Sequence, residues 1–167
     1  MDKTLGLQLM AGRVKRYHNH SIIGEQTVGE HTYGMVQIIR CLTDDDCSGN
    51  LLKAALDHDV PEAITGDIPF TAKKGHPELK IAVDNVEAEV EKEYGLQRLL
   101  NAAEYNVLKQ ADLLEMGFFG INQMRLGNKY GGGDVVVNVL EALGKLRPTI
   151  NGQILATMLE DMYHERK

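Results

Sequence analysis

The chain has 167 residues, of which 43% are hydrophobic, 25% charged and 5% aromatic, a composition typical of one globular domain. Eighteen Lys and Arg against 24 Asp and Glu give a formal net charge of −6, which argues against a broad basic surface for a nucleic-acid polymer. Apolar runs are short, so we expect neither a membrane span nor a secretory signal. The two cysteines, Cys41 and Cys47, lack zinc-site spacing and are predicted to be reduced thiols of a cytoplasmic protein.

Helical periodicity begins at the N-terminus and predicts a first helix from about Lys3 to Tyr17. Thr27 and Glu30 then form a capping-box pattern, in which each side chain bonds the backbone amide of the other. The next helix therefore begins at Val28 and is expected to end before the acidic loop at 43–50. This placement puts His31 in the first turn of that helix.

The third helix is expected to follow Asn50 and to stop before Pro61, because proline lacks an amide proton and crowds the preceding turn. His58 and Asp59 then lie at a helix end. After a turn at 66–69, further helices are expected over 78–94, 103–126, 134–146 and from 150 on.

Details of the later helices follow from their end residues. Gly95 is expected to end the charged helix 78–94, whose acidic residues are read as a solvated face. A run of glycines, 131–133, is expected to join the next two helices, and Thr149 to cap the last one. Phe118 and Phe119 are expected in the core.

One segment, 135–137, has three consecutive valines and is the only stretch with an argument for a strand, but it is short and flanked by helical pattern. Neither a repeat nor a linker divides the chain. We therefore predict an all-α fold and one domain over residues 1–167.

Polar residues on otherwise apolar helices mark the candidate site. Asp112 stands among apolar neighbours, where an ionised carboxylate costs several kcal/mol unless it is paired or bound to metal. His31 and the His58-Asp59 pair complete a set of imidazole and carboxylate groups. Such a mixed set suits divalent Mn, Co, Fe, Zn or Mg ions.

The order Glu30-His31, His58-Asp59 and Asp112 on successive helices resembles the H…HD…D signature of the HD-domain metal-dependent phosphohydrolases. The strings RYHNH, GEH, HDVPEAITGDIPFTAK and LKQAD are similar to those of the YfbR-type 5′-deoxyribonucleotidases, and closer still to the compact phage dATP triphosphohydrolases of the DatZ type. The resemblance covers about residues 10–126. It implies a compact HD-domain helical bundle in which His31, His58, Asp59 and Asp112 hold a divalent ion such as Co, Mn, Zn or Mg.

The same resemblance implies catalytic carboxylates after the His-Asp pair. Glu62, in HDxxE, matches the carboxylate beside the attacking water and is the expected general base. Asp67, in TGD, matches a second acidic group near the phosphates. The alternative for Glu62 is a purely structural role, as a first-turn carboxylate after Pro61 that interacts favourably with the helix dipole.

Substrate contacts are implied for three further residues. Arg16 and Lys73 match phosphate-contacting positions, with Lys74 as the alternative to Lys73. Tyr17 stands where relatives carry an aromatic residue, often Trp, that packs on the nucleoside. Its ring is therefore expected to stack on a base or sugar.

The leading functional hypothesis is a deoxynucleotide phosphohydrolase that converts dATP to deoxyadenosine and triphosphate in phage nucleotide-pool control, in the host cytoplasm if it is phage-encoded. The alternative is a 5′-nucleotidase acting on deoxyribonucleoside monophosphates at the same bond. A third hypothesis is a non-catalytic HD binding protein or helical interaction module, against which the presence of Glu62 and Asp67 argues. Apolar residues of the last helix, such as Met158 and Met162, and the resemblance predict a homo-oligomer, a dimer or hexamer.

Overall fold

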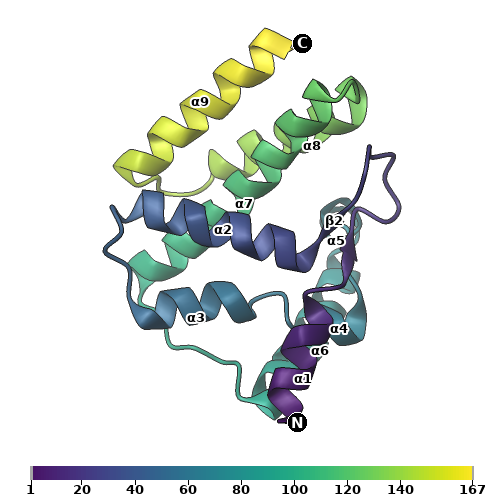
Figure 1. The fold of residues 1–167 in the computed structure, drawn as a ribbon, viewed down its shortest axis with the longest axis vertical. Coiled ribbons are helices and arrows are strands. Elements are labelled where there is room, and N and C mark those ends of the chain that lie inside the picture. Colours follow the sequence, from purple (N-terminus) through teal and green to yellow (C-terminus); the bar gives the residue numbers. More distant parts are fainter. Residues whose placement is uncertain (1, 167) are drawn as a thin grey trace.

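A computed structural model describes residues 2–166 and is mostly helical, which confirms the all-α prediction (Figure 1). The elements in chain order are α1 Lys3–Ala11, β1 Lys15–Arg16, β2 Gln26–Thr27, α2 Val28–Leu42, α3 Gly49–Asp57, α4 Glu62–Thr65, α5 Phe70–Gly75, α6 Pro77–Tyr94, α7 Ala102–Arg125, α8 Lys129–Leu143 and α9 Ile150–Arg166. Among the described residues, none of the helices is both long and apolar enough to cross a membrane.

The N-terminal segment differs from its prediction, because α1 ends at Ala11 rather than near Tyr17. Residues 15–16 instead pair antiparallel with residues 26–27, with Arg16 opposite Gln26. The valines at 135–137 lie inside α8, which confirms that they form no strand, but they were wrongly taken as the only stretch with an argument for one, since residues 15–16 and 26–27 are strands. At residues 15–16, backbone pairing with residues 26–27 overrode the local helical pattern.

The capping box before α2 is confirmed. The Thr27 hydroxyl accepts a hydrogen bond from the Glu30 amide at 3.2 Å, and the Glu30 carboxylate accepts one from the Thr27 amide at 2.7 Å. The next helix, α3, begins slightly earlier than predicted because Ser48 caps it. It ends at Asp57, so His58 and Asp59 follow a helix end as expected.

The sequence predicted that the glycine run joins two helices. The run instead lies within the first turns of α8. A Cβ added to Gly132 would lie 2.4 Å from the carbonyl oxygen of Gly120 in α7. These glycines therefore allow close contact between two helix backbones. The predicted cap of α9 is confirmed, because the Thr149 hydroxyl accepts a hydrogen bond from the Gly152 amide at 2.9 Å.

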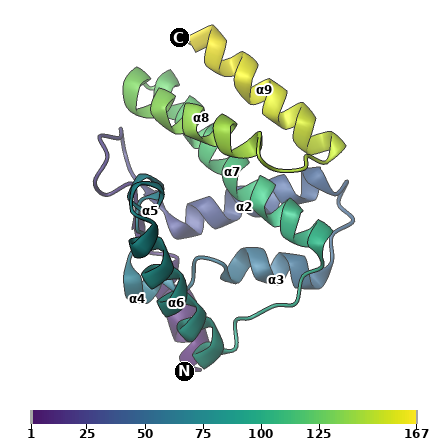
Figure 2. The same ribbon diagram turned by 180° about the vertical axis from the view of Figure 1, so that it is seen from behind.

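Helix α7 lies in the middle of the bundle, with α2 beside it and α8 and α9 beyond (Figures 1 and 2). One apolar cluster joins α2, α3 and α7 around Met35 and Leu114, and another joins α7, α8 and α9 around Ile121 and Leu159. The first turn of α2, the end of α3 and the middle of α7 are thereby held together. These three places carry the predicted metal ligands.

Candidate active site

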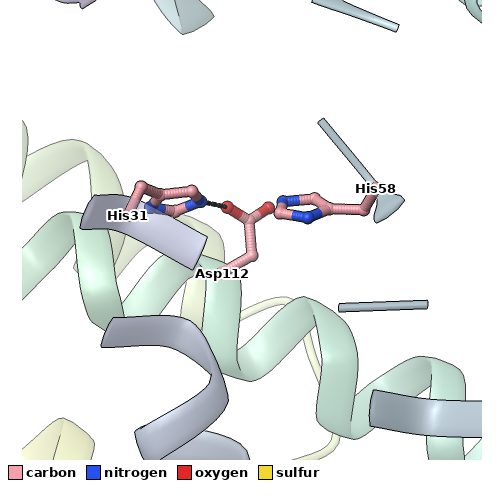
Figure 3. A group of neighbouring side chains, drawn as sticks. All are labelled: His31, His58 and Asp112. Carbon is pink, nitrogen blue, oxygen red and sulfur yellow. Dashed lines mark ion pairs between the residues drawn. The ribbon is translucent and has the colours of Figure 1, made fainter. Parts of the chain in front are cut away.

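Three of the four predicted metal ligands form a cluster whose donor atoms all lie within 4.8 Å of one another: His31, His58 and Asp112 (Figure 3). The Asp112 carboxylate points between the two imidazole rings, and its Oδ1 lies 3.4 Å from His31 Nε2. The three residues come from α2, the end of α3 and α7. Segments 81 residues apart in the sequence therefore meet at one point.

The fourth predicted ligand, Asp59, lies beside this cluster. Its Oδ1 is 3.1 Å from His58 Nε2, and its Oδ2 is 3.6 Å from His31 Nε2. Its Oδ2 also accepts a hydrogen bond from Arg16 Nη1 at 2.9 Å. Burial alone would raise the pKa of Asp59, but the nearby charges of His58 and Arg16 outweigh it and hold that pKa below its usual value.

The donor atoms of this cluster fit a divalent ion. His31 Nε2 and His58 Nε2 are both buried and make no hydrogen bond within residues 2–166. A buried polar atom without a partner costs free energy, and a metal ion would satisfy both nitrogens. Burial also works against an ionised Asp112, yet its close contact with His31 and the charge of Lys109 lower its pKa well below the usual value.

Glu62 is the buried carboxylate next to this cluster. Its side chain is 6% exposed, and its Oε2 has no hydrogen-bond partner in the described part of the chain. Burial, together with the carboxylates of Asp59 and Asp67, raises the pKa of Glu62 to about 8. A carboxyl group with such a pKa takes up and releases a proton close to neutral pH.

Arg16 and Tyr17 reach the site from the short β1 strand. Arg16 is buried and bound to Asp59, as described above. Tyr17 has a φ of 56°, uncommon for a residue with a side chain, and its amide donates a hydrogen bond to Asp67 Oδ2 at 3.1 Å. Asp67 therefore holds the backbone turn that presents both residues.

The Tyr17 ring is stacked on Phe119, with the centroids 4.7 Å apart and the planes 10° from parallel. The sequence predicted both phenylalanines in the core, but only Phe118 packs there. Phe119 supports an aromatic wall of the site instead. The His20 ring packs edge-to-face against the Tyr17 ring, with their centroids 5.9 Å apart, and extends the same wall.

A cavity of about 870 Å³ opens onto the cluster. Its lining includes every predicted site residue except His31, namely Arg16, Tyr17, His58, Asp59, Glu62, Asp67, Lys73 and Asp112. His31 has no exposed side-chain area and lies behind the lining.

The two lysines of α5 differ in this cavity. The side chain of Lys73 makes neither a hydrogen bond nor an ion pair with any described residue, whereas the Lys74 side chain donates to Glu141 in α8 at 2.9 Å. The geometry thus favours Lys73 over Lys74 as the cation for a ligand. The sequence predicted that the acidic face of α6 is solvated. This prediction was wrong in part, because Glu87 and Glu91 line the cavity.

Two polar residues of the site were missed in the sequence, although both lie on the same face of α7 as Asp112. Lys109 lies one turn before Asp112, with its Nζ 3.8 Å from Asp112 Oδ2. Glu115 lies one turn after it and contacts His31 Nδ1. The i−3 and i+3 spacing was the available signal, since such residues share a helix face.

Comparison with known families gives a match over residues 8–103 to the family described as 5′-deoxynucleotidase YfbR-like, more than half of the chain. The chain belongs to this family of HD-domain phosphohydrolases. The match contains the predicted ligands His31, His58 and Asp59 but ends before Asp112. Among curated proteins there is no significant match.

Solved structures share the fold at low identity. An HD-domain phosphohydrolase from Listeria innocua is 20% identical with a TM-score of 0.77, covering 96% of this chain and 88% of that one. A protein from Pyrococcus horikoshii is 23% identical with a TM-score of 0.73, covering all of both chains. The HD phosphohydrolase DatZ of cyanophage S-2L, solved with dA and one catalytic Zn²⁺ ion, is 18% identical with a TM-score of 0.71, covering 96% of both chains.

Proposed function

We propose that the protein is a metal-dependent deoxynucleotide phosphohydrolase that converts dATP and water to deoxyadenosine and triphosphate. The observation that carries the proposal is one cavity lined by His58 and Asp112 of the cluster, by Glu62 and by several cations, with His31 directly behind the lining. Glu62 Oε2 has no hydrogen-bond partner within residues 2–166. The cations of this lining are Arg16, Lys73, Lys74, Lys80, Lys109 and Lys145. Among these cations of residues 2–166, Lys73 alone forms no ion pair with a carboxylate, and an unpaired cation beyond the cluster suits a substrate whose phosphates extend past the metal site.

The ion would be held by His31, His58, Asp59 and Asp112. Their two imidazoles and two carboxylates suit Co, Mn, Zn or Mg, and DatZ provides a Zn²⁺ precedent in the same fold. When bound, such an ion supplies Lewis-acid activation of water and of a phosphoryl oxygen.

Glu62 is the proposed general base. Its free Oε2 accepts a proton from the attacking water, whose oxygen forms a bond to the α-phosphorus. The bond between that phosphorus and the 5′ oxygen breaks, and the 5′ oxygen leaves as a hydroxyl group after taking up one proton. Triphosphate carries away the oxygen of the water.

The other predicted residues bind and orient the nucleotide. Arg16 and Lys73 contact phosphate oxygens, and the Tyr17 ring, supported by Phe119, packs on the nucleoside. Asp67 contributes by holding the Tyr17 backbone and by adding negative charge near Glu62. The adenine preference rests on the dA in the DatZ structure.

A second candidate keeps the same site but takes deoxyribonucleoside 5′-monophosphates and releases inorganic phosphate. The family match favours it, since that family is described by its 5′-deoxynucleotidase activity. The two candidates differ in whether the cations beyond the cluster bind β- and γ-phosphates.

The test is an incubation of the purified protein with Mn, Co or Zn and, separately, dATP, dGTP, dAMP and ATP, with the products resolved by chromatography. Deoxyadenosine and intact triphosphate from dATP support the first candidate. Phosphate from dAMP, with dATP untouched, supports the second. An Asp59→Ala variant, which lacks one carboxylate of the cluster, serves as the inactive control, and absence of turnover by the parent protein would contradict both candidates.

The homo-oligomer, dimer or hexamer, stays a prediction. Of the α9 residues Met158, Leu159 and Met162 on which the prediction drew, only Met158 is exposed, because Leu159 is buried and Met162 packs against the core. Ile150, Ile154 and Met158 are exposed at intervals of four residues and form an apolar outer stripe. Light scattering of the purified protein measures the oligomeric state directly.

A further inference from the structure

Glu115 is a largely buried carboxylate that none of the proposed catalytic steps uses. Its Oε2 contacts His31 Nδ1, the ring nitrogen on the side away from Asp112. Its Oε1 accepts a hydrogen bond from Gln26 Nε2 at 2.9 Å. Glu115 side-chain exposure is 12%, and that of His31 is 0%, so water scarcely competes for the contact between them.

The partner of Nδ1 decides what Nε2 can do. An ionised carboxylate only accepts hydrogen bonds, so the Nδ1 that faces Glu115 must carry a proton. In a neutral imidazole Nε2 then has the lone pair, and this nitrogen faces Asp112 at 3.4 Å and Asp59 at 3.6 Å. Glu115 thereby fixes both the tautomer and the direction of the His31 ring.

The surroundings fix Glu115 in turn. Gln26, itself buried, is placed by the pairing of β2 with β1. On α2, Gly34 leaves the space that the carboxylate fills, because a Cβ there would lie 2.9 Å from Glu115 Cγ and 3.2 Å from its Oε1. Gln26 of β2, Gly34 of α2 and His31 thus surround the Glu115 side chain.

The other histidine of the cluster is oriented differently. His58 Nδ1 lies 3.0 Å from the backbone carbonyl oxygen of Ala55, within its own helix end. Both rings therefore direct Nε2 to the cluster, but His58 relies on its backbone while His31 relies on a charged side chain 84 residues away. Only His31 can lose its orienting group through a single side-chain substitution.

We propose that Glu115 is a positioning residue that holds His31 in the tautomer and orientation needed to bind the metal ion, with Gln26 holding Glu115. The inference rests on the proposed function, because it requires the metal site. Loss of an orienting group outside the ligands typically lowers metal affinity by about 10- to 100-fold.

The experiment compares Glu115→Gln, Glu115→Leu and the parent protein by competition of Co²⁺ and Zn²⁺ with a chelator of known affinity. We expect affinity to fall about 10-fold in Glu115→Gln, which keeps an acceptor oxygen but loses the charge, and about 100-fold in Glu115→Leu. Glu89→Gln, at an exposed position on α6, is the matched loss of one carboxylate and should leave affinity unchanged.

A second measurement separates orientation from general stability. Nitrogen-15 NMR of the metal-free imidazoles should show a protonated His31 Nδ1 in the parent protein and a changed His31 signal in Glu115→Leu, with His58 unaffected. Equal affinity in all variants while the parent binds the ion would overturn the role of Glu115 alone. A parent protein that binds neither ion would overturn the metal site as well.

Discussion

Two adjacent stretches of α7 have different roles: one places charged side chains at the candidate site, and the other packs against neighbouring helices. From 109 to 115, the charged side chains of Lys109, Asp112 and Glu115 face the site, and Asp112 and Glu115 both contact His31, while Ala111 and Leu114 pack against α2 and α3. From 117 to 124 the helix faces α8 and α9 with glycines and apolar side chains. In the first stretch the donor atoms of the side chains matter most, and in the second their size and shape matter most, although both belong to one continuous helix.

This difference predicts that substitutions in the two stretches fail in different ways. In the first, an isosteric change removes function and leaves the fold. In the second, a single added methyl group weakens the fold and leaves the chemistry of the remaining folded molecules intact. The four predictions below run from the largest expected effect to the smallest. Those at Asp112 and Gly132 test this separation directly, and those at Glu62 and Glu141 concern other residues that line the cavity.

The largest effect is expected for Asp112→Asn. The amide keeps the shape of the side chain but removes the charge that faces both histidines, so ion affinity should fall by about 100-fold or more and turnover with it. Metal content and product formation measure both quantities. Thermal unfolding of the metal-free variant should stay close to that of the parent, and a collapse of stability would show that Asp112 serves the fold.

Glu62→Gln should separate ion binding from reaction within the site. Glu62 lines the cavity outside the group of His31, His58 and Asp112, so its amide variant should keep the ion and lose about 10²- to 10⁴-fold in turnover through loss of the base. Steady-state kinetics and metal analysis of the same sample test this. If the variant purifies without its ion, Glu62 is a ligand rather than a base.

Gly132→Ala, on α8, tests the close contact that α8 makes with residues 117–124 of α7. Its Cβ would lie 2.4 Å from the Gly120 carbonyl oxygen, and overpacking of this kind costs about 1–3 kcal/mol of unfolding free energy. Gly133→Ala is the matched control, because its Cβ would meet only Tyr163 at 3.7 Å and it gains up to about 1 kcal/mol in helix propensity. Urea unfolding should rank the two variants on opposite sides of the parent, and equal stabilities would contradict the close contact.

The smallest effect is expected at the cavity rim, where Glu141 pairs with Lys145 and Lys74. These two lysines lower the pKa of Glu141 to about 2. Since the pKa is lower in the folded than in the unfolded protein, the stabilisation is present above about pH 4.3 and is lost as the pH falls toward 2. The melting temperature of Glu141→Gln should lie slightly below that of the parent at pH 7, and the gap should narrow below pH 4. A gap independent of pH would rule out the charge as its cause.

Much of the fold could be predicted because it depends on neighbours in sequence. The capping box of Thr27 and Glu30, the glycine end of α6 and the cap at Thr149 involve residues within a few positions of each other, and all three are present. The errors came where distant segments decided the outcome. Residues 15–16 left the helical pattern to pair with β2, and the glycines of α8 met those of α7.

The candidate site shows the same division. Residue types and their order along the chain pointed to His31, His58, Asp59 and Asp112, and the structure brings these side chains together. Glu115 escaped notice because its role depends on a ring 84 residues earlier in the chain. Phe119 was expected in the core because its sequence context is apolar, yet it stacks on Tyr17 at the cavity.

The sequence by itself determined the helical class, most helix ends and the set of candidate metal ligands, because periodicity, capping and donor chemistry are properties of local segments. Only the tertiary structure decided which nitrogen of His31 faces the cluster, which α5 lysine is left unpaired and which acidic residues of α6 reach the cavity. These features depend on distances between helices, and packing of the whole chain sets those distances.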